Sequence, residues 1–137
     1  MKVIFARSNK PIALLIRLVT WSRWHHCAAI TEDGKHVIEA KGGVGVRKIP
    51  IETFKAMYKT WEIAELDCAD DKRAHKFVNG QIGKPYDLKG VFGLLLRSGW
   101  DKPNEWFCSE LIAAASGRFR HNKVSRVTPE HIWMISR

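Results

Sequence analysis

Short apolar runs separated by turn-forming residues characterise the first half of the chain. Runs of about four to eight residues that are rich in β-branched and aromatic residues are typical of strands. The pattern predicts five strands, at Lys2–Ala6, Cys27–Thr31, His36–Ala40, Val44–Ile49 and Trp61–Leu66. The Asp33-Gly34 pair between the second and third of these strands is a strong hairpin signal. The sheet is therefore expected to be antiparallel.

Apolar residues at helical spacing lie between some of these strands and fill the second half of the chain. They predict helices at Ile12–Thr20, Ile51–Tyr58, Asp70–Gln81, Leu88–Arg97 and Phe107–Ser116, and a short helix after Thr128. Asn9 and Thr128 offer side chains that can cap the helices that follow them. Because strands come first and helices later, we predict the α+β class, with about five antiparallel strands packed against helices.

The composition favours one compact unit. The chain has 137 residues, of which 45% are apolar and 27% charged, so it is not a disordered chain. The length suits a single domain over residues 1–137, and no repeat or linker divides it. Cys27, Cys68 and Cys108 form an odd set without a CxxC pair, which argues against a disulfide framework and favours a reducing compartment.

The sequence carries no recognisable targeting or membrane-spanning segment. Arg7 and Lys10 interrupt the apolar residues near the N-terminus, and no small-residue cleavage site follows a long apolar block. The run Gly90–Leu96 is far shorter than the ~20 residues that a membrane span needs. We therefore expect a cytoplasmic protein without a transmembrane segment, which lysis or phage-associated export would release if it acts outside the cell.

The charge is strongly basic. Lys and Arg total 23 against 14 Asp and Glu, a formal net charge of +9, which predicts attraction to membrane surfaces or to an anionic envelope polymer. Bases crowd the stretch from Arg118 to Arg126. No nucleic-acid-binding signature accompanies them, so we interpret the stretch as a solvated rim and do not expect a nucleic-acid partner.

The candidate chemistry begins with Cys108, which lies at the start of a predicted helix. Backbone N–H groups and the positive end of the helix dipole stabilise a thiolate at such a position. Cys108 also shares a helical face with Leu111 and Ile112, so an inert core thiol is the alternative interpretation.

A thiol nucleophile needs a base, and histidine suits this task near neutral pH. His26 opens the second predicted strand, and Glu39 lies on its hairpin partner, where a carboxylate can orient an imidazole. A solvent-exposed histidine and an outward-facing glutamate are the alternatives that position alone leaves open.

Five motifs of the chain follow one another in an informative order. They are Trp24-His25-His26-Cys27-Ala28-Ala29-Ile30, Ile38-Glu39-Ala40, Gly42-Gly43-Val44, Gly83-Lys84-Pro85-Tyr86-Asp87 and Trp106-Phe107-Cys108-Ser109-Glu110-Leu111. In this order they resemble the circularly permuted branch of the NlpC-like papain-fold cysteine peptidases and amidases, which includes relatives of lecithin retinol acyltransferase. The histidine precedes the cysteine in that branch. The resemblance implies a permuted papain-like fold with the nucleophile at a helix N-terminus.

The resemblance also implies a catalytic triad. It assigns Cys108 as the nucleophile, His26 as the base and Glu39 as the third member. Many relatives have Ser-His where this chain has His25-His26, so one histidine has to be chosen. We choose His26, because strand alternation would place it on the face that carries Ala28.

Two further residues are candidates for contacting the substrate or its oxyanion. Tyr86 occupies the loop tyrosine position of the resembling family, and His25 neighbours the chosen base; turn packing is the alternative for Tyr86. We expect no metal and no other cofactor. His25, His26 and Cys27 are consecutive and point to alternate faces, and no second Cys/His pair completes four zinc ligands.

The predicted function is therefore that of a cysteine hydrolase, a peptidase or amidase that passes through a thioester. The resemblance implies cell-wall peptide amides as substrates first, and lipid esters or amides second, with acyl transfer in place of hydrolysis as a variant. A module that binds a peptide, glycan or lipid without turnover is the competing hypothesis. The sequence leaves the oligomeric state open.

Overall fold

The computed structural model describes residues 1–87 and 105–137, and the helix predicted at 88–97 lies outside them. Five strands form one sheet: β1 (Lys2–Arg7), β2 (His26–Ile30), β3 (His36–Lys41), β4 (Gly45–Pro50) and β5 (Thr60–Glu65). Their order is β4-β3-β2-β1-β5, and every neighbouring pair is antiparallel. The predicted α+β class with a five-stranded antiparallel sheet is confirmed.

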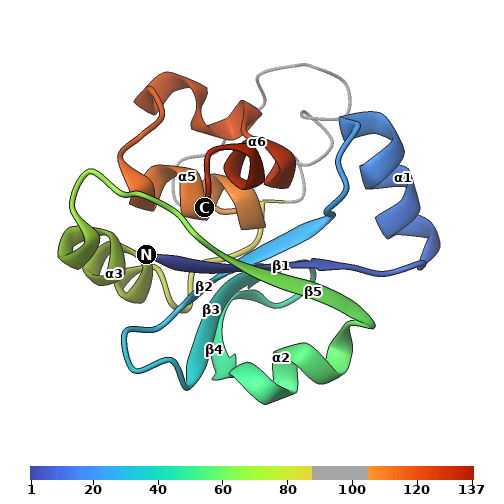
Figure 1. The fold of residues 1–137 in the computed structure, drawn as a ribbon, viewed down its shortest axis with the longest axis horizontal. Helices are drawn as coiled ribbons and strands as arrows, with labels where there is room; N and C mark the ends of the chain where they lie inside the picture. The colour runs from blue at the N-terminus through green and yellow to red at the C-terminus, as the bar shows by residue number, and fades with distance from the viewer. Residues whose placement is uncertain (88–104) are drawn as a thin grey trace.

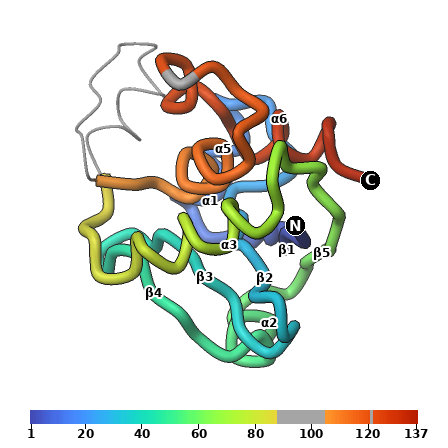
Figure 2. Tube along the Cα trace, turned by 90° about the vertical axis from the view of Figure 1, so that its left-hand side faces the viewer, coloured from blue at the N-terminus to red at the C-terminus, as the bar shows by residue number. Residues whose placement is uncertain are grey.

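Helices cover both faces of this sheet (Figure 1, Figure 2). On one face lie α3 (Asp71–Gly80), α5 (Cys108–Ser116) and α6 (Pro129–Met134); α2 (Ile51–Met57) lies on the other, and α1 (Pro11–Thr20) connects β1 to β2. A short 3-10 helix, η1 (His121–Arg126), was not predicted. The other described elements begin and end within one residue of their predicted bounds.

The core has two layers because side chains alternate along the strands. On β1, Val3 and Phe5 face α5, whereas Ile4 and Ala6 face α2. The helix α5 is buried along almost its whole length, since small and apolar residues fill nearly all of its positions. Such burial on the sheet holds the first residue of α5 in a fixed place.

Helix caps differ in part from the prediction. Thr128 caps α6 as predicted, accepting a hydrogen bond of 3.3 Å from the backbone N–H of His131. The predicted cap Asn9 is wrong. Lys10 occupies the N-cap of α1 without a side-chain cap bond, and Asn9 lies one residue before it, because Pro11, whose ring fixes a helical φ, is the first helical residue.

One glycine brings the Gly83–Asp87 loop against the sheet. Gly45 has a φ of +98°, and a Cβ there would lie 2.5 Å from the carbonyl oxygen of Lys84. The backbone N–H of Val46 then donates to that same oxygen at 2.8 Å. Only glycine allows this approach, so the loop that carries Tyr86 is joined to the start of β4.

Candidate active site

Cys108 is the first residue of α5. The N-cap Phe107 is extended, and the first helical hydrogen bond runs from the N–H of Leu111 to the carbonyl of Phe107, at 3.1 Å. The backbone N–H groups of the first turn therefore point out of the helix end, where they and the dipole favour negative charge on the Cys108 sulfur.

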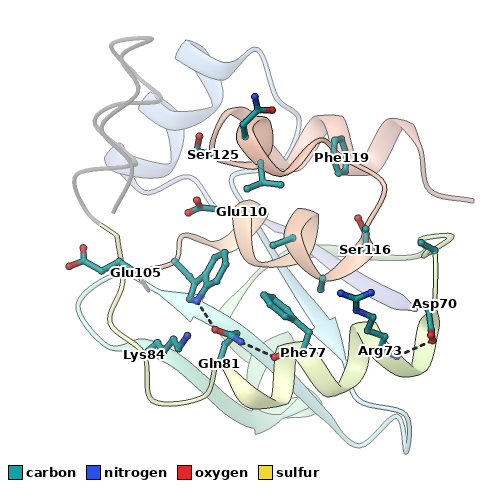
Figure 3. A pocket seen from close by; sticks show the side chains of 17 residues that line it. Asp70, Arg73, Phe77, Gln81, Lys84, Glu105, Glu110, Ser116, Phe119 and Ser125 are labelled. Carbon is teal, nitrogen blue, oxygen red and sulfur yellow. Dashed lines mark hydrogen bonds between the residues drawn. The ribbon is translucent and has the colours of Figure 1, made fainter. Parts of the chain in front are cut away.

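The segment that precedes Cys108 is fixed by the tyrosine loop and by α3. The N–H of Trp106 donates to the carbonyl of Pro85 at 3.1 Å, and its carbonyl accepts from the N–H of Asp87 at the same distance. The indole of Trp106 also donates to Oε1 of Gln81 at 3.0 Å (Figure 3). These hydrogen bonds fix the backbone that leads into Cys108, and none of them involves the Cys108 side chain.

His26 and Glu39 form a close buried pair. Nε2 of His26 lies 2.6 Å from Oε2 of Glu39, and the Glu39 side chain is fully buried. The His26 ring stacks on Phe54, which belongs to the core layer that also contains Ala28. The structure therefore places His26 on the strand face that alternation predicts.

Arg47 is a further member of this cluster that sequence reasoning missed. It stands opposite Glu39 in the register of β3 and β4. Its Nε and Nη2 both donate to Oε1 of Glu39, at 2.9 and 2.7 Å. The Gly42-Gly43 turn was visible in the sequence. Its length, however, sets which residues of β3 and β4 stand opposite each other, and the sequence did not give that length.

The pKa values show which proton the site holds. Burial opposes charge on His26, but hydrogen bonding and attraction from Cys108 and then Glu39 outweigh it and raise the pKa of His26 to about 9. The pKa of Cys108 is held well below its usual value by a hydrogen bond from Cys27 and by His26, against the effect of burial. These two directions favour a thiolate at Cys108 and an imidazolium at His26.

Cys27 was expected to be a buried residue without a role, yet it lowers the pKa of the nucleophile candidate Cys108. Burial, and then hydrogen bonding and the charge of Cys108, raise the pKa of Cys27 well above its usual value, so its thiol stays protonated. Cys27 lies on β2, in the core layer that contains Cys108. No motif in the sequence indicated this effect.

His25 stands beside the site with a different electrostatic character. Burial, and then the positive charge of His26, lower the pKa of His25 to about 4, so its imidazole is neutral. The Sγ of Cys108 lies 4.0 Å from the backbone carbonyl oxygen of His25. The side chain that carries the proton next to Cys108 is therefore that of His26.

Two tyrosines border this cluster. Tyr86 is half-buried, and a Cβ on Gly42 would lie 3.7 Å from its ring. Burial and the charge of Cys108 raise the pKa of Tyr86, so it keeps its hydroxyl proton. The ring centroid of Tyr58 lies 5.8 Å from the ring centroid of His25 and 5.8 Å from that of His26. Nothing in the sequence indicated this residue.

A pocket of about 910 Å³ lies along α5, on the side that faces α3 and η1 (Figure 3). Trp106 and Phe77 line it together with Arg73 and Glu110. Cys108, His26 and Glu39 are not among its described lining residues. The cavity therefore adjoins the segment that leads to Cys108 but does not contain the thiolate.

Comparison with known proteins decides the family. The sequence matches the family described as "Permuted papain-like amidase enzyme, YaeF/YiiX, C92 family" over residues 2–126. The chain belongs to the C92 family. This confirms the resemblance to permuted papain-like enzymes, and it places the chain among proteins named as amidases. No curated protein matches the sequence.

A solved structure shares the C92 fold. The chain resembles the crystal structure of the metalloprotein yiiX from Escherichia coli O157:H7, with a TM-score of 0.64 and 20% sequence identity. The match covers 83% of this chain and 62% of that chain, so this chain spans less than two thirds of its length. At this identity the likeness shows the fold alone.

Within residues 1–87 and 105–137, no group of three or more His, Cys, Asp and Glu side chains is arranged to hold a metal ion. A metal-free site stays a prediction. Among the described helices, none is long and apolar enough to cross a bilayer.

Proposed function

We propose that this C92 protein is a cysteine amidase in which Cys108 attacks an amide carbonyl, His26 transfers protons and Glu39 orients His26. The observation that carries the proposal is the buried His26–Glu39 pair, with 2.6 Å between Nε2 and Oε2, together with the electrostatic influence of His26 that lowers the pKa of Cys108. An inert core cysteine would need neither a charged partner nor a helix N-terminus.

The reaction begins with the thiolate of Cys108. Its sulfur forms a bond to the carbonyl carbon, and the π electrons of the carbonyl move to oxygen as an oxyanion. When the oxyanion collapses, the C–N bond breaks and the leaving amine takes the proton of His26. Water then attacks the thioester, gives its proton to His26 and releases the carboxylic acid together with the Cys108 sulfur.

The oxyanion needs donors that are in place before it forms. The backbone N–H of Cys108 is such a donor, because it belongs to the first turn of α5 and has no helical acceptor. The hydroxyl of Tyr86 stays protonated at neutral pH and is the second candidate donor. His25 is neutral and offers a ring nitrogen for contact with the substrate.

The proposed substrate class rests on the family, and the charge of the chain supports it. Peptide amides of the cell wall are the substrates that we propose first, and lipid amides second. The net charge of +9 supports attraction to an anionic envelope polymer that carries such peptides.

The test compares Cys108→Ala with Cys68→Ala, a cysteine variant outside the site. Wild type and Cys68→Ala should release an amine from cell-wall peptide fragments and carry an acyl adduct on Cys108 in mass spectrometry. Cys108→Ala should do neither. An adduct that persists in Cys108→Ala or moves to Cys27 would defeat the proposal. Substrate retention without turnover by folded wild type would favour the binding module instead.

A further inference from the structure

The helix α1 carries its large apolar side chains on the face that points away from the protein. Its inner side is formed at helical spacing by Ala13, Ile16, Arg17 and Thr20, which are buried or half-buried. The outer side presents Ile12 (58% exposed), Leu14 (46%), Leu15 (46%), Leu18 (74%) and Val19 (40%). A surface helix normally has the reverse arrangement, so this face is built to meet an apolar surrounding.

Trp21 extends this apolar face beyond the end of α1. It is the C-cap residue and has a left-handed backbone with a φ of 52°, which non-glycine residues rarely adopt. Its side chain is 90% exposed. The indole is thus held in water at a conformational cost, beside the exposed Leu18. Tryptophan favours the boundary between lipid and water, where its ring is buried and its N–H stays hydrated.

The charged side chains of α1 and of the segments next to it in the sequence are all basic. Arg7, Lys10, Arg17 and Arg23 lie in or beside the helix, and residues 7–23 contain no acid. Glu130 reaches this segment from α6, but its Oε2 accepts hydrogen bonds from the backbone N–H of Arg23 at 2.7 Å and from Ser22 at 3.2 Å. The surface around the apolar face is therefore cationic.

We infer that α1 and Trp21 dock the protein on an anionic lipid surface. Outward leucines, a terminal tryptophan and flanking cations are the combination that an interfacial helix needs. Ten residues are too few to span a bilayer, so the helix would lie in the plane of the surface. A groove on a protein partner would accept the leucines but would give no reason for the basic residues that flank them.

The docking face lies close to the candidate active site. The helix α1 leads into β2, whose first residue is His26, and it stands at the periphery of the molecule (Figure 1). The charge of Arg17 acts on His25. Docking would thus bring this end of the sheet to the membrane surface. The inference does not depend on catalysis, so Cys108→Ala should bind vesicles as wild type does.

The test is co-sedimentation of the full chain with vesicles. Vesicles of phosphatidylcholine with about one third phosphatidylglycerol should retain the protein, and salt should weaken the retention. The Leu18→Ser variant should lose at least about tenfold in the partition constant. Ile63→Ser is the matched control, because Ile63 is a 40% exposed aliphatic residue on β5, and it should bind as wild type does.

A charge variant and a measurement of the oligomeric state test the docking of α1 further. Lys10→Glu should lower binding to anionic vesicles while unfolding at the same temperature as wild type, because Lys10 is an exposed side chain. Equal vesicle binding by wild type and Leu18→Ser would overturn the inference, and so would absence of binding by wild type. A dimer that becomes a monomer in Leu18→Ser would instead assign the face to a second copy of this chain.

Discussion

Arg47 donates two hydrogen bonds to a single oxygen of Glu39, at 2.9 and 2.7 Å. This leaves the other oxygen, Oε2, to His26 at 2.6 Å. Glu39 is fully buried, so its charge needs both partners. Arg47 contacts the carboxylate of Glu39. It positions Glu39, which in turn positions the imidazole.

Removal of Arg47 should therefore act through Glu39. We expect Arg47→Ala to lower kcat/KM about tenfold or more and to destabilise the fold by about 1–3 kcal/mol, because a buried carboxylate loses a charged partner. Steady-state kinetics and urea unfolding measure the two effects. Lys48→Ala changes the exposed neighbour of Arg47 on β4 and should leave both quantities near wild type. If the two variants behave alike, Arg47 does not position Glu39.

Glu39→Gln tests the charge of the third residue with little change in shape. The carboxylate helps to raise the pKa of His26. Its loss should lower that pKa and reduce kcat about 100-fold. The pH profile of kcat/KM separates this from a packing defect, since only the electrostatic effect moves the alkaline limb to lower pH. An unchanged alkaline limb would contradict the assignment.

Cys27 should act on the thiolate of Cys108 as a hydrogen-bond donor. Cys27→Ala removes the donor and should raise the pKa of Cys108, whereas Cys27→Ser keeps a donor and should restore part of the shift. The rate of alkylation by iodoacetamide, measured from pH 5 to 9, reports this pKa. Cys68→Ala is the control. A Cys27→Ala profile that coincides with wild type would remove Cys27 from the site.

The pKa shifts of Cys108 and His26 predict how the rate of turnover changes with pH. The pKa of Cys108 is lowered, so its thiolate persists as the pH falls below the usual range of a thiol. The pKa of His26 is raised to about 9, so His26 keeps the proton for the leaving amine until the pH rises through that value. We expect turnover to decline above about pH 9.

The labelling pattern at pH 6 checks the acidic limb. Iodoacetamide should modify Cys108 and spare Cys68, because burial raises the pKa of Cys68 to about 11. Preferential modification of Cys68, located by peptide mass spectrometry, would show that Cys108 is not activated.

The two neighbouring histidines should respond differently to substitution. His26→Gln removes the residue that pairs with both Cys108 and Glu39 and should reduce kcat by at least about 100-fold. His25→Gln should cost less than about tenfold and act mainly on KM, because the imidazole of His25 is neutral and beside the site. A larger loss of kcat in His25→Gln than in His26→Gln would reverse the choice of base.

Much of the fold follows from local patterns in the sequence. Apolar alternation, the Asp33-Gly34 turn and the Thr128 cap are local signals, and they located the described strands and helices to within one residue. Asn9 failed as a cap because α1 begins at Pro11, which leaves Asn9 one residue before the N-cap position. The 3-10 helix η1 was missed, since a short helix of polar residues has no apolar periodicity.

The choice of Cys108, His26 and Glu39 as candidates needed only residue types, strand alternation and the order of motifs along the chain. Arg47, Cys27 and Tyr58 needed the fold itself. The contact of Arg47 depends on the register of a hairpin, that of Cys27 on the packing of α5 against β2, and that of Tyr58 on the packing of α2. Each of these is decided only when segments distant in the sequence come together. A sequence specifies which groups can ionise, but their pKa values arise from burial and from neighbours that only folding supplies.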